Sequence, residues 1–177
     1  MRLLVITQKI DIEDHNLGFF HRWVEEFAKH SPKVTVIAGF VGKHSFPANI
    51  SVYSLGKEEG AGKIVLIYRF WKLFLGHCLK SADAIFFHMI PEYVIAVYPF
   101  IHFSKKPKAL WYAHKSVTPW LKLAERAVDF VFTASDLSFR LPSKKVIYTG
   151  HAIDTKFFVV KEQKNLGPNS GIRIMSS

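Results

Sequence analysis

Histidines stand at or just beyond the ends of three apolar segments in this sequence, each beside a small, acidic or basic residue. A histidine side chain can donate or accept a hydrogen bond and titrates near neutral pH, so it suits contact with a sugar or a phosphate. Three such positions close together would form a polar ligand site. The three sets are His88 with Glu92, His114 with Lys115, and His151 with Gly150.

Two other chemistries find little support in the sequence. The histidines are not spaced as a tight metal-ligand pair, so we expect no metal and no other cofactor. Nucleophilic catalysis is also not indicated, because Cys78 lies within a segment predicted to be helical and no Gly-x-Ser-x-Gly sequence occurs.

The elements that would position these residues are short runs rich in Val, Ile and Phe, most of them separated by helix-like segments. Their near-continuous apolarity is typical of strands buried on both faces, and the alternation predicts an α/β fold. We expect a Rossmann-like, doubly wound and mostly parallel sheet of about seven strands with helices on both faces. The predicted strands are Arg2–Thr7, Lys33–Gly39, Ile50–Leu55, Asp83–His88, Lys108–Ala113, Asp129–Ala134 and Lys145–Gly150.

Ligands of such sheets bind beyond the carboxyl ends of the strands. The polar residues gather at those ends in this sequence, and we therefore expect a ligand crevice there. After the first strand come Gln8, Lys9, Asp11, Asp14, Asn16 and Gly18; Ser116 and Ser135 follow the fifth and sixth strands, and Asp154 follows the seventh.

Helix signals lie between the strands. Phe20, Trp23 and Phe27 have helical spacing, and Asn16 is expected to cap that helix. Prolines near the first turns predict two further helices, at Pro91 and Pro119, and Pro99 is expected to end or kink the former.

The segment Gly62–Lys80 combines a dense apolar and aromatic set with four Lys or Arg residues. That composition suits an amphipathic helix in a bilayer interface, and an anionic membrane surface is therefore a candidate partner. An ordinary core-packed helix with a basic outer face remains the alternative.

The composition limits the possible binding partners and the cellular location of the chain. The chain has 177 residues and a formal charge of +10, which favours acidic partners. Nucleic acid is not expected, because no nucleic-acid-binding motif accompanies the basic residues. The single cysteine cannot form an internal disulfide, and no apolar run is long enough to span a bilayer. We expect a cytoplasmic location, with peripheral attachment to the inner face of a membrane left open.

Four segments resemble landmarks of a known family. The stretch GHAIDTKFF is similar to the Gly-x-Gly-Val/Ile-Asp-x-x-x-Phe signature of glycosyltransferase family 4, the retaining GT-B sugar transferases, with Ala152 where the family has glycine. The segments NLGFFHRWVEEFAKH, LWYAHKS and VFTASDLSFR look like three more landmarks of the amino-terminal domain, in the same order. The resemblance covers nearly the whole chain.

The resemblance implies an amino-terminal, acceptor-side domain over residues 1–160, a linker over 161–171, and over 172–177 the start of a missing carboxy-terminal donor-binding domain. It implies transfer of a sugar from a nucleotide-sugar to a saccharide or lipid-linked acceptor, with this part inactive alone. A non-catalytic α/β binding module that uses the same crevice or a basic surface is the alternative.

Roles for individual residues follow from the same resemblance. His114 matches the active-site histidine beside the donor sugar, whereas Asp154 matches a structural position in the turn. We expect donor phosphate or sugar contacts from Gly18, Asn16, Gly150 and His151, and acceptor contacts from His88, Glu92, Lys115 and Ser135. Each residue also has a purely structural explanation: a loop glycine, a satisfied histidine, or a solvated helix end.

Overall fold

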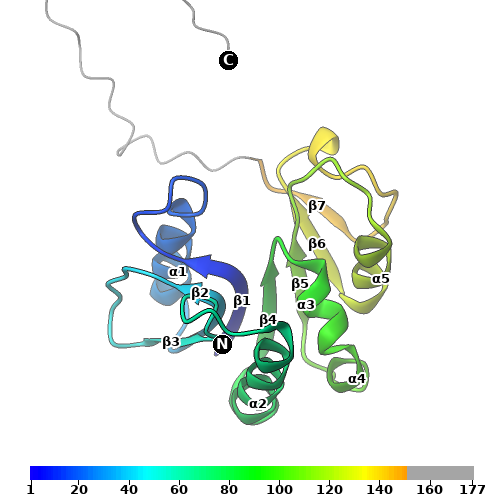
Figure 1. Ribbon diagram of the computed structural model, residues 1–177. Coiled ribbons are helices and arrows are strands. Elements are labelled where there is room, and N and C mark those ends of the chain that lie inside the picture. The colour runs from blue at the N-terminus through cyan, green and yellow to red at the C-terminus, as the bar shows by residue number, and fades with distance from the viewer. Residues whose placement is uncertain (151–177) are drawn as a thin grey trace, which may run out of the picture.

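Seven strands form one sheet, in which every neighbouring pair is parallel and the order is β3-β2-β1-β4-β5-β6-β7 (Figure 1). This is a computed structural model, and it describes residues 1–150 apart from the side chains of residues 77–80. All seven predicted strands are present. They are β1 (Leu3–Ile10), β2 (Val34–Val41), β3 (Ile50–Ser54), β4 (Ala84–His88), β5 (Lys108–Trp111), β6 (Phe130–Thr133) and β7 (Val146–Tyr148).

The first strand is longer than its sequence indicates. We expected β1 to end at Thr7, but Lys9 pairs with Phe40 and Ile10 with Val41. The Lys9 ammonium also lies 4.5 Å from the centre of the Phe40 ring, a cation–π contact that favours this pairing. Gln8 and Lys9, predicted to lie in a loop, therefore belong to the strand.

The helices follow the strands as the proline signals predicted. Pro91 and Pro119 both stand in first turns, and Thr118 caps α5 by accepting a hydrogen bond from the Leu121 N–H. The helix after β4 is broken at Val97, and Pro99 lies in the first turn of the next helix, α4. The helices are α1 (Phe19–Lys29), α2 (Lys63–Ser81), α3 (Pro91–Ala96), α4 (Tyr98–Ile101) and α5 (Pro119–Ala127), with a 3₁₀ turn, η1, at Asp136–Ser138.

The predicted cap of α1 was wrong. Gly18, not Asn16, occupies the N-cap position, and no side chain caps the helix there. The carboxylate of Asp14 instead accepts hydrogen bonds from the backbone N–H groups of Asn16 and Leu17. An aspartate that binds backbone groups two and three residues later forms a compact turn, so the chain needs no cap from Asn16.

Side chains that alternate along the strands form two cores, one on each face of the sheet. Leu4 and Ile6 of β1 pack in the cluster that contains Phe70 of α2, and residues of α3 and α5 belong to the same cluster. Val5, between them in the sequence, packs in the cluster that contains Phe20 of α1. Helices cover both faces, as predicted, but unevenly: α1 lies on one face, and α2, α3 and α5 lie on the other (Figure 1).

Several predictions fall outside the described residues. They concern His151 and Asp154, the end of the predicted domain, the linker over 161–171 and the segment 172–177. Within the described part of the chain, none of the helices has the length and hydrophobicity needed to cross a bilayer.

Candidate functional site

The sheet changes direction between β1 and β4. From β1 the chain builds outward through β2 and β3, and it then returns to the other side of β1 to build β4 through β7. At such a switch point, the loops after the two central strands turn to opposite sides and leave a crevice for a ligand. The loop after β1 and the segments after β4 and β5 therefore define the candidate site.

His114 lies in an exposed turn after β5. Its Nδ1 accepts a hydrogen bond from the Ser116 N–H at 3.1 Å. An acceptor at Nδ1 carries no proton, so the neutral ring has its proton on Nε2. Because the ring is exposed, that N–H is available to a ligand. The turn thus holds His114 in the tautomer that donates from Nε2.

Tyr112 and Glu92 support this turn. The Tyr112 hydroxyl donates to the Ser116 carbonyl oxygen at 3.1 Å, which ties the turn to the buried end of β5. Burial raises the pKa of Tyr112, and the nearby negative charge of Glu92 raises it further. Glu92, in the first turn of α3, is therefore close enough to act electrostatically on the strand end that positions His114.

His88 ends β4 at the switch point, but its side chain is completely buried. The ring stacks on Phe20 of α1 with centroids 3.7 Å apart, and its Nδ1 lies 3.1 Å from the Thr7 hydroxyl. Its Nε2 is buried and has no hydrogen-bond partner among the described residues. Burial lowers the pKa of His88 to about 3, so the ring is neutral near pH 7. Contact with an acceptor would require α1 to move, and that role stays a prediction.

Met89, which no sequence signal singled out, has a left-handed backbone with φ of 62°. A side chain at such a φ is uncommon and is held only where the surroundings determine it. Here the Met89 N–H donates to the Trp111 carbonyl oxygen at 2.8 Å, and the Ala113 N–H contacts its sulfur at 3.2 Å. Met89 thus joins the ends of β4 and β5 directly beside the His114 turn.

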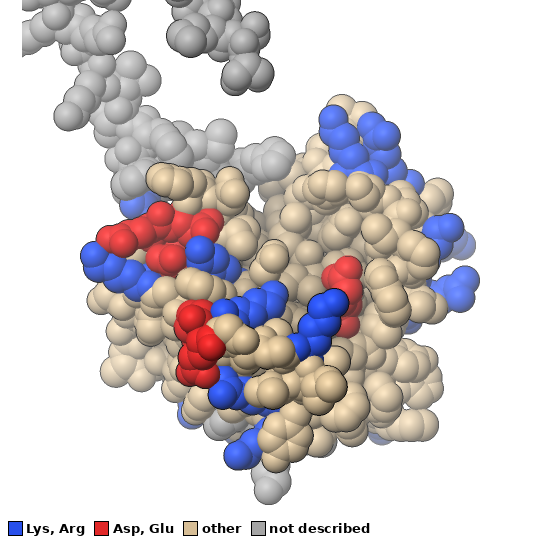
Figure 2. Space-filling model, in the orientation of Figure 1, with Lys and Arg blue, Asp and Glu red and all other residues tan. Residues whose placement is uncertain are grey.

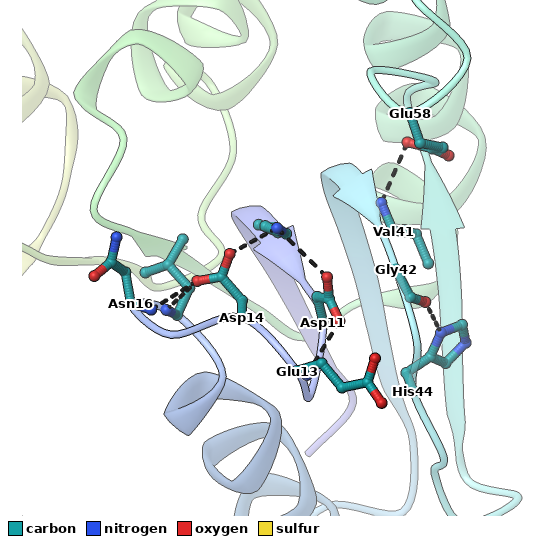
Figure 3. A network of polar contacts seen from close by, with 10 residues as sticks. Asp11, Glu13, Asp14, Asn16, Val41, Gly42, His44 and Glu58 are labelled. Atoms are coloured by element: carbon teal, nitrogen blue, oxygen red, sulfur yellow. Dashed lines mark hydrogen bonds and ion pairs between the residues drawn. The ribbon is translucent and has the colours of Figure 1, made fainter.

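The loop after β1 is closed on itself by ion pairs. In Figure 3 the side chains of Asp11 and Asp14 converge, and the Lys9 ammonium lies 2.6 Å from Asp14 Oδ2 and 3.4 Å from Asp11 Oδ2. The Lys9 hydrogen bond and the backbone N–H groups of Leu17 and Asn16 lower the pKa of Asp14 to about 2. The carboxylate is therefore ionised and occupied by internal donors.

Gly18 is also engaged within this loop. Its N–H donates to the Asp14 carbonyl oxygen at 2.9 Å, and an added Cβ would lie only 2.5 Å from that oxygen. Close approach of two backbone segments thus explains the glycine without a ligand. A phosphate contact by Gly18 or by Asn16 would compete with Asp14, and this role also stays a prediction.

The remaining predicted residues lie at neighbouring strand ends. Lys115 is exposed in the His114 turn, and the Ser135 hydroxyl lies 2.9 Å from the Ser138 hydroxyl after β6. Gly150 is exposed after β7 with φ of 72°, a conformation that glycine adopts without strain. Lys115 adjoins His114 in the same turn, and Glu92 acts electrostatically on Tyr112 at the start of that turn. Ser135 and Gly150 lie farther along the same edge of the sheet.

Acidic and basic side chains are unevenly distributed over the surface. In Figure 2 acidic side chains gather over β1, β2 and their loops, whereas Lys and Arg predominate at the side where α5 and β7 lie. A cavity of about 650 Å³ is lined by Ile12 of the β1 loop and, on α1, by residues that include His21, Arg22 and Glu25, and none of the predicted site residues that the structure describes lines it. Within residues 1–150, histidine, cysteine and carboxylate side chains form no group of three that could hold a metal ion.

Comparison with known proteins defines the fold. No protein-family model matches the sequence, and no curated protein matches it. Solved structures do match, at low identity and over nearly the whole described part. They include MurG from Acinetobacter baumannii (10% identity, TM-score 0.56), UDP-GlcNAc 2-epimerase from Methanocaldococcus jannaschii (10%, 0.52) and Anabaena Alr3699/HepE in complex with UDP (13%, 0.49).

At 10% identity, the likeness to MurG and to the epimerase shows the fold alone, a Rossmann-like α/β fold. The matches cover 84% of the chain in both cases, but only 46% of the MurG chain and 45% of the epimerase chain. The chain therefore spans about half the length of the proteins whose fold it shares.

Proposed function

We propose that this chain is the amino-terminal, acceptor-side half of a retaining GT-B glycosyltransferase. The reaction would move a sugar from a nucleotide-sugar to a saccharide or lipid-linked acceptor. The observation that carries the proposal is the His114 turn, where an exposed imidazole is fixed in one tautomer, with its proton on Nε2, at the carboxyl edge of a parallel sheet.

The geometry suits one part of such a reaction. A nucleotide-sugar releases a diphosphate, and positioned donors that stabilise developing charge supply much of the rate enhancement in enzymes. His114 Nε2–H is such a donor, and Lys115 beside it adds a positive charge. The groups that bind the nucleotide would come from a second domain across the crevice, in agreement with the coverage of about half of each GT-B neighbour.

The fold on its own does not select this function, because α/β sheets of this kind serve many chemistries. A non-catalytic module could use the same crevice to bind a saccharide. The difference between the two is chemical turnover in the complete protein, so a transfer assay separates them.

The test is sugar transfer from a panel of UDP- and GDP-sugars, with the 177-residue chain alone and with the two-domain protein proposed here. We expect no detectable transfer by the chain alone, because catalysis by positioning loses many powers of ten when one reactant is not held. We expect the two-domain protein to form a product that keeps the anomeric configuration of the donor, as read by NMR. A product with inverted configuration would refute the retaining mechanism. Turnover by the isolated chain would refute the assignment of nucleotide binding to a second domain.

A further inference from the structure

Helix α2 carries two apolar stripes, one packed in the core and one beside it that is exposed. Phe70 and Phe74 are buried in the core, and Leu66 packs against the same cluster. Residues three, four and seven positions apart share one side of a helix, and Ile64, Ile67, Tyr68 and Trp71 have that spacing. These four are exposed, Ile64 by 85% and Tyr68 by 64%. We call them the outer stripe of α2.

A helix that covers a sheet normally has one apolar stripe, which faces the core, and a polar opposite side. The outer stripe of α2 is therefore not needed to cover the sheet. Single exposed apolar residues are common on proteins, whereas a contiguous group of large ones indicates an interaction surface.

Trp71 connects the outer stripe to α4. Its indole N–H donates to the Ala96 carbonyl oxygen at 2.8 Å, and its ring meets Phe100 edge-on at 6.1 Å. On and after α4, Tyr98 is exposed and Phe103 is 87% exposed. Helices α2 and α4 thus meet at Trp71 and Phe100, and each exposes further apolar side chains. Figure 1 shows the two helices at the same end of the molecule.

The same surface carries positive charge and no carboxylate of its own. Neither residues 63–81 nor residues 97–108 contain Asp or Glu. Lys63 and Lys72 are exposed on α2, and Lys105 is exposed after α4. In Figure 2 the surface over α2 and α4, at the bottom of the view, is tan and blue without red.

We propose that the outer stripe of α2 and the adjoining side chains of α4 dock on an anionic lipid bilayer, with α2 lying along the interface. Apolar and aromatic side chains beside lysines match the two attractions that such a surface offers, insertion into the acyl boundary and charge at the headgroups. A second copy of the chain fits less well, because identical faces would bring the same lysines together without an acidic partner. The proposal does not depend on the sugar-transfer function.

The test is sedimentation of the 177-residue chain with vesicles of phosphatidylcholine alone and of phosphatidylcholine with about one third phosphatidylglycerol. We expect clear binding to the anionic vesicles, weakened by added salt because the lysine contribution is screened. Equal recovery with the two kinds of vesicle, or no recovery with either, would overturn the proposal.

Substitutions on α2 test whether this surface is the one that binds the bilayer. Ile64→Ser combined with Ile67→Ser removes two exposed side chains that do not support the core, and we expect partitioning to fall about tenfold or more. Lys63→Gln with Lys72→Gln should weaken binding about fivefold per charge. The matched control is Leu123→Ser with Lys122→Gln on α5, an exposed apolar residue beside an exposed lysine.

A folding check accompanies each variant, and all should keep the thermal midpoint of the wild-type chain. If the α5 control lost as much binding as the α2 variants, general basicity and not this surface would explain the binding. Size-exclusion chromatography tests whether a second copy of the chain occupies the surface instead. If the wild-type chain formed a dimer and the Ile64→Ser, Ile67→Ser variant were a monomer, the surface would serve self-association and the bilayer proposal would be overturned.

Discussion

The loop after β1 and the turn after β5 are both rich in residues that could bind a ligand, yet the structure uses them differently. In the β1 loop the Asp14 carboxylate is shared by Lys9 and two backbone N–H groups, and the Gly18 N–H is bound to Asp14 as well. In the β5 turn, internal bonds fix His114 Nδ1 and leave Nε2 exposed. In the β1 loop these polar groups bind one another and stabilise the loop, whereas the β5 turn leaves the His114 ring exposed to solvent.

We propose that this difference separates a structural from a functional use of the same residue types. Polar composition at a strand end indicates that something polar is bound, but the bound group can be another part of the chain. Changes confined to one region should therefore produce different kinds of effect, on turnover in the β5 turn and on stability in the β1 loop.

The largest effect is expected from His114→Ala in the two-domain protein. Turnover should fall about 10²-fold or more, the scale for loss of one positioned donor at a transition state. The thermal midpoint should not change, because the side chain is exposed. His30→Ala, an exposed histidine at the end of α1, is the matched control and should retain full activity. Unchanged turnover for His114→Ala would make the β5 turn structural as well.

His88 should produce a pH-dependent loss of stability. Its pKa is about 3 in the folded protein and about 6.5 in an unfolded chain, so the unfolded state takes up the proton first. The stability that the neutral, buried His88 ring contributes is complete above about pH 7, and it decreases as the pH falls from 6.5 toward 3. The loss should be on the order of 3 kcal/mol near pH 4.

The measurement for His88 is the thermal midpoint against pH for the wild-type chain and for His88→Phe, which keeps a ring beside Phe20. The variant should lose less stability between neutral and acidic pH than the wild type. Parallel curves would show that the imidazole does not remain neutral when folded.

Gly18→Ala compares a structural with a phosphate-binding role for the β1 loop. The added Cβ would lie 2.5 Å from a backbone oxygen of Asp14, so the loop must shift at a cost of about 1–3 kcal/mol. Calorimetric unfolding checks this value, with Gly62→Ala as the control because its Cβ would meet nothing within 4 Å. Normal stability together with weaker donor binding would instead support the phosphate role.

Asp14→Asn should have the smallest effect, a thermal midpoint lower by about two to four degrees at neutral pH. The folded-state pKa of Asp14, about 2, lies below its unfolded value, so the contribution is present above about pH 4 and is lost as the pH falls toward 2. The midpoints of the two proteins should therefore converge in acid. A constant difference across the pH range would mean that the charge of Asp14 is not what stabilises the loop.

The strands could be predicted well because burial on both faces leaves a strong local pattern, and all seven appear in the structure. The end of β1 could not, because the pairing of Lys9 and Ile10 depends on β2, about thirty residues away. The prediction that Asn16 caps α1 was wrong for a related reason. Asn16 is a good cap residue, but the Asp14 carboxylate accepts the hydrogen bond from its backbone N–H and fixes the turn before the helix.

The candidate site was predictable only as an edge of the sheet. The sequence placed both His114 and His88 at strand ends, with the stronger functional role for His114, and nothing local showed that Phe20 would cover His88 while His114 stayed exposed. The left-handed backbone at Met89 left no signal, since methionine is not a residue that such a position favours. Likewise, the composition of α2 indicated an amphipathic helix but not that a second apolar stripe would remain exposed beside the packed one.

The most direct test of the proposed division of labour is calorimetric titration of the 177-residue chain with UDP- and GDP-sugars. We propose that most donor-binding groups lie on a second domain and that this chain contributes the β5 turn and its neighbours. We therefore expect a dissociation constant no tighter than about 1 mM for every sugar nucleotide in the panel. A micromolar constant for any of them would show that this half holds the donor itself and would contradict the account.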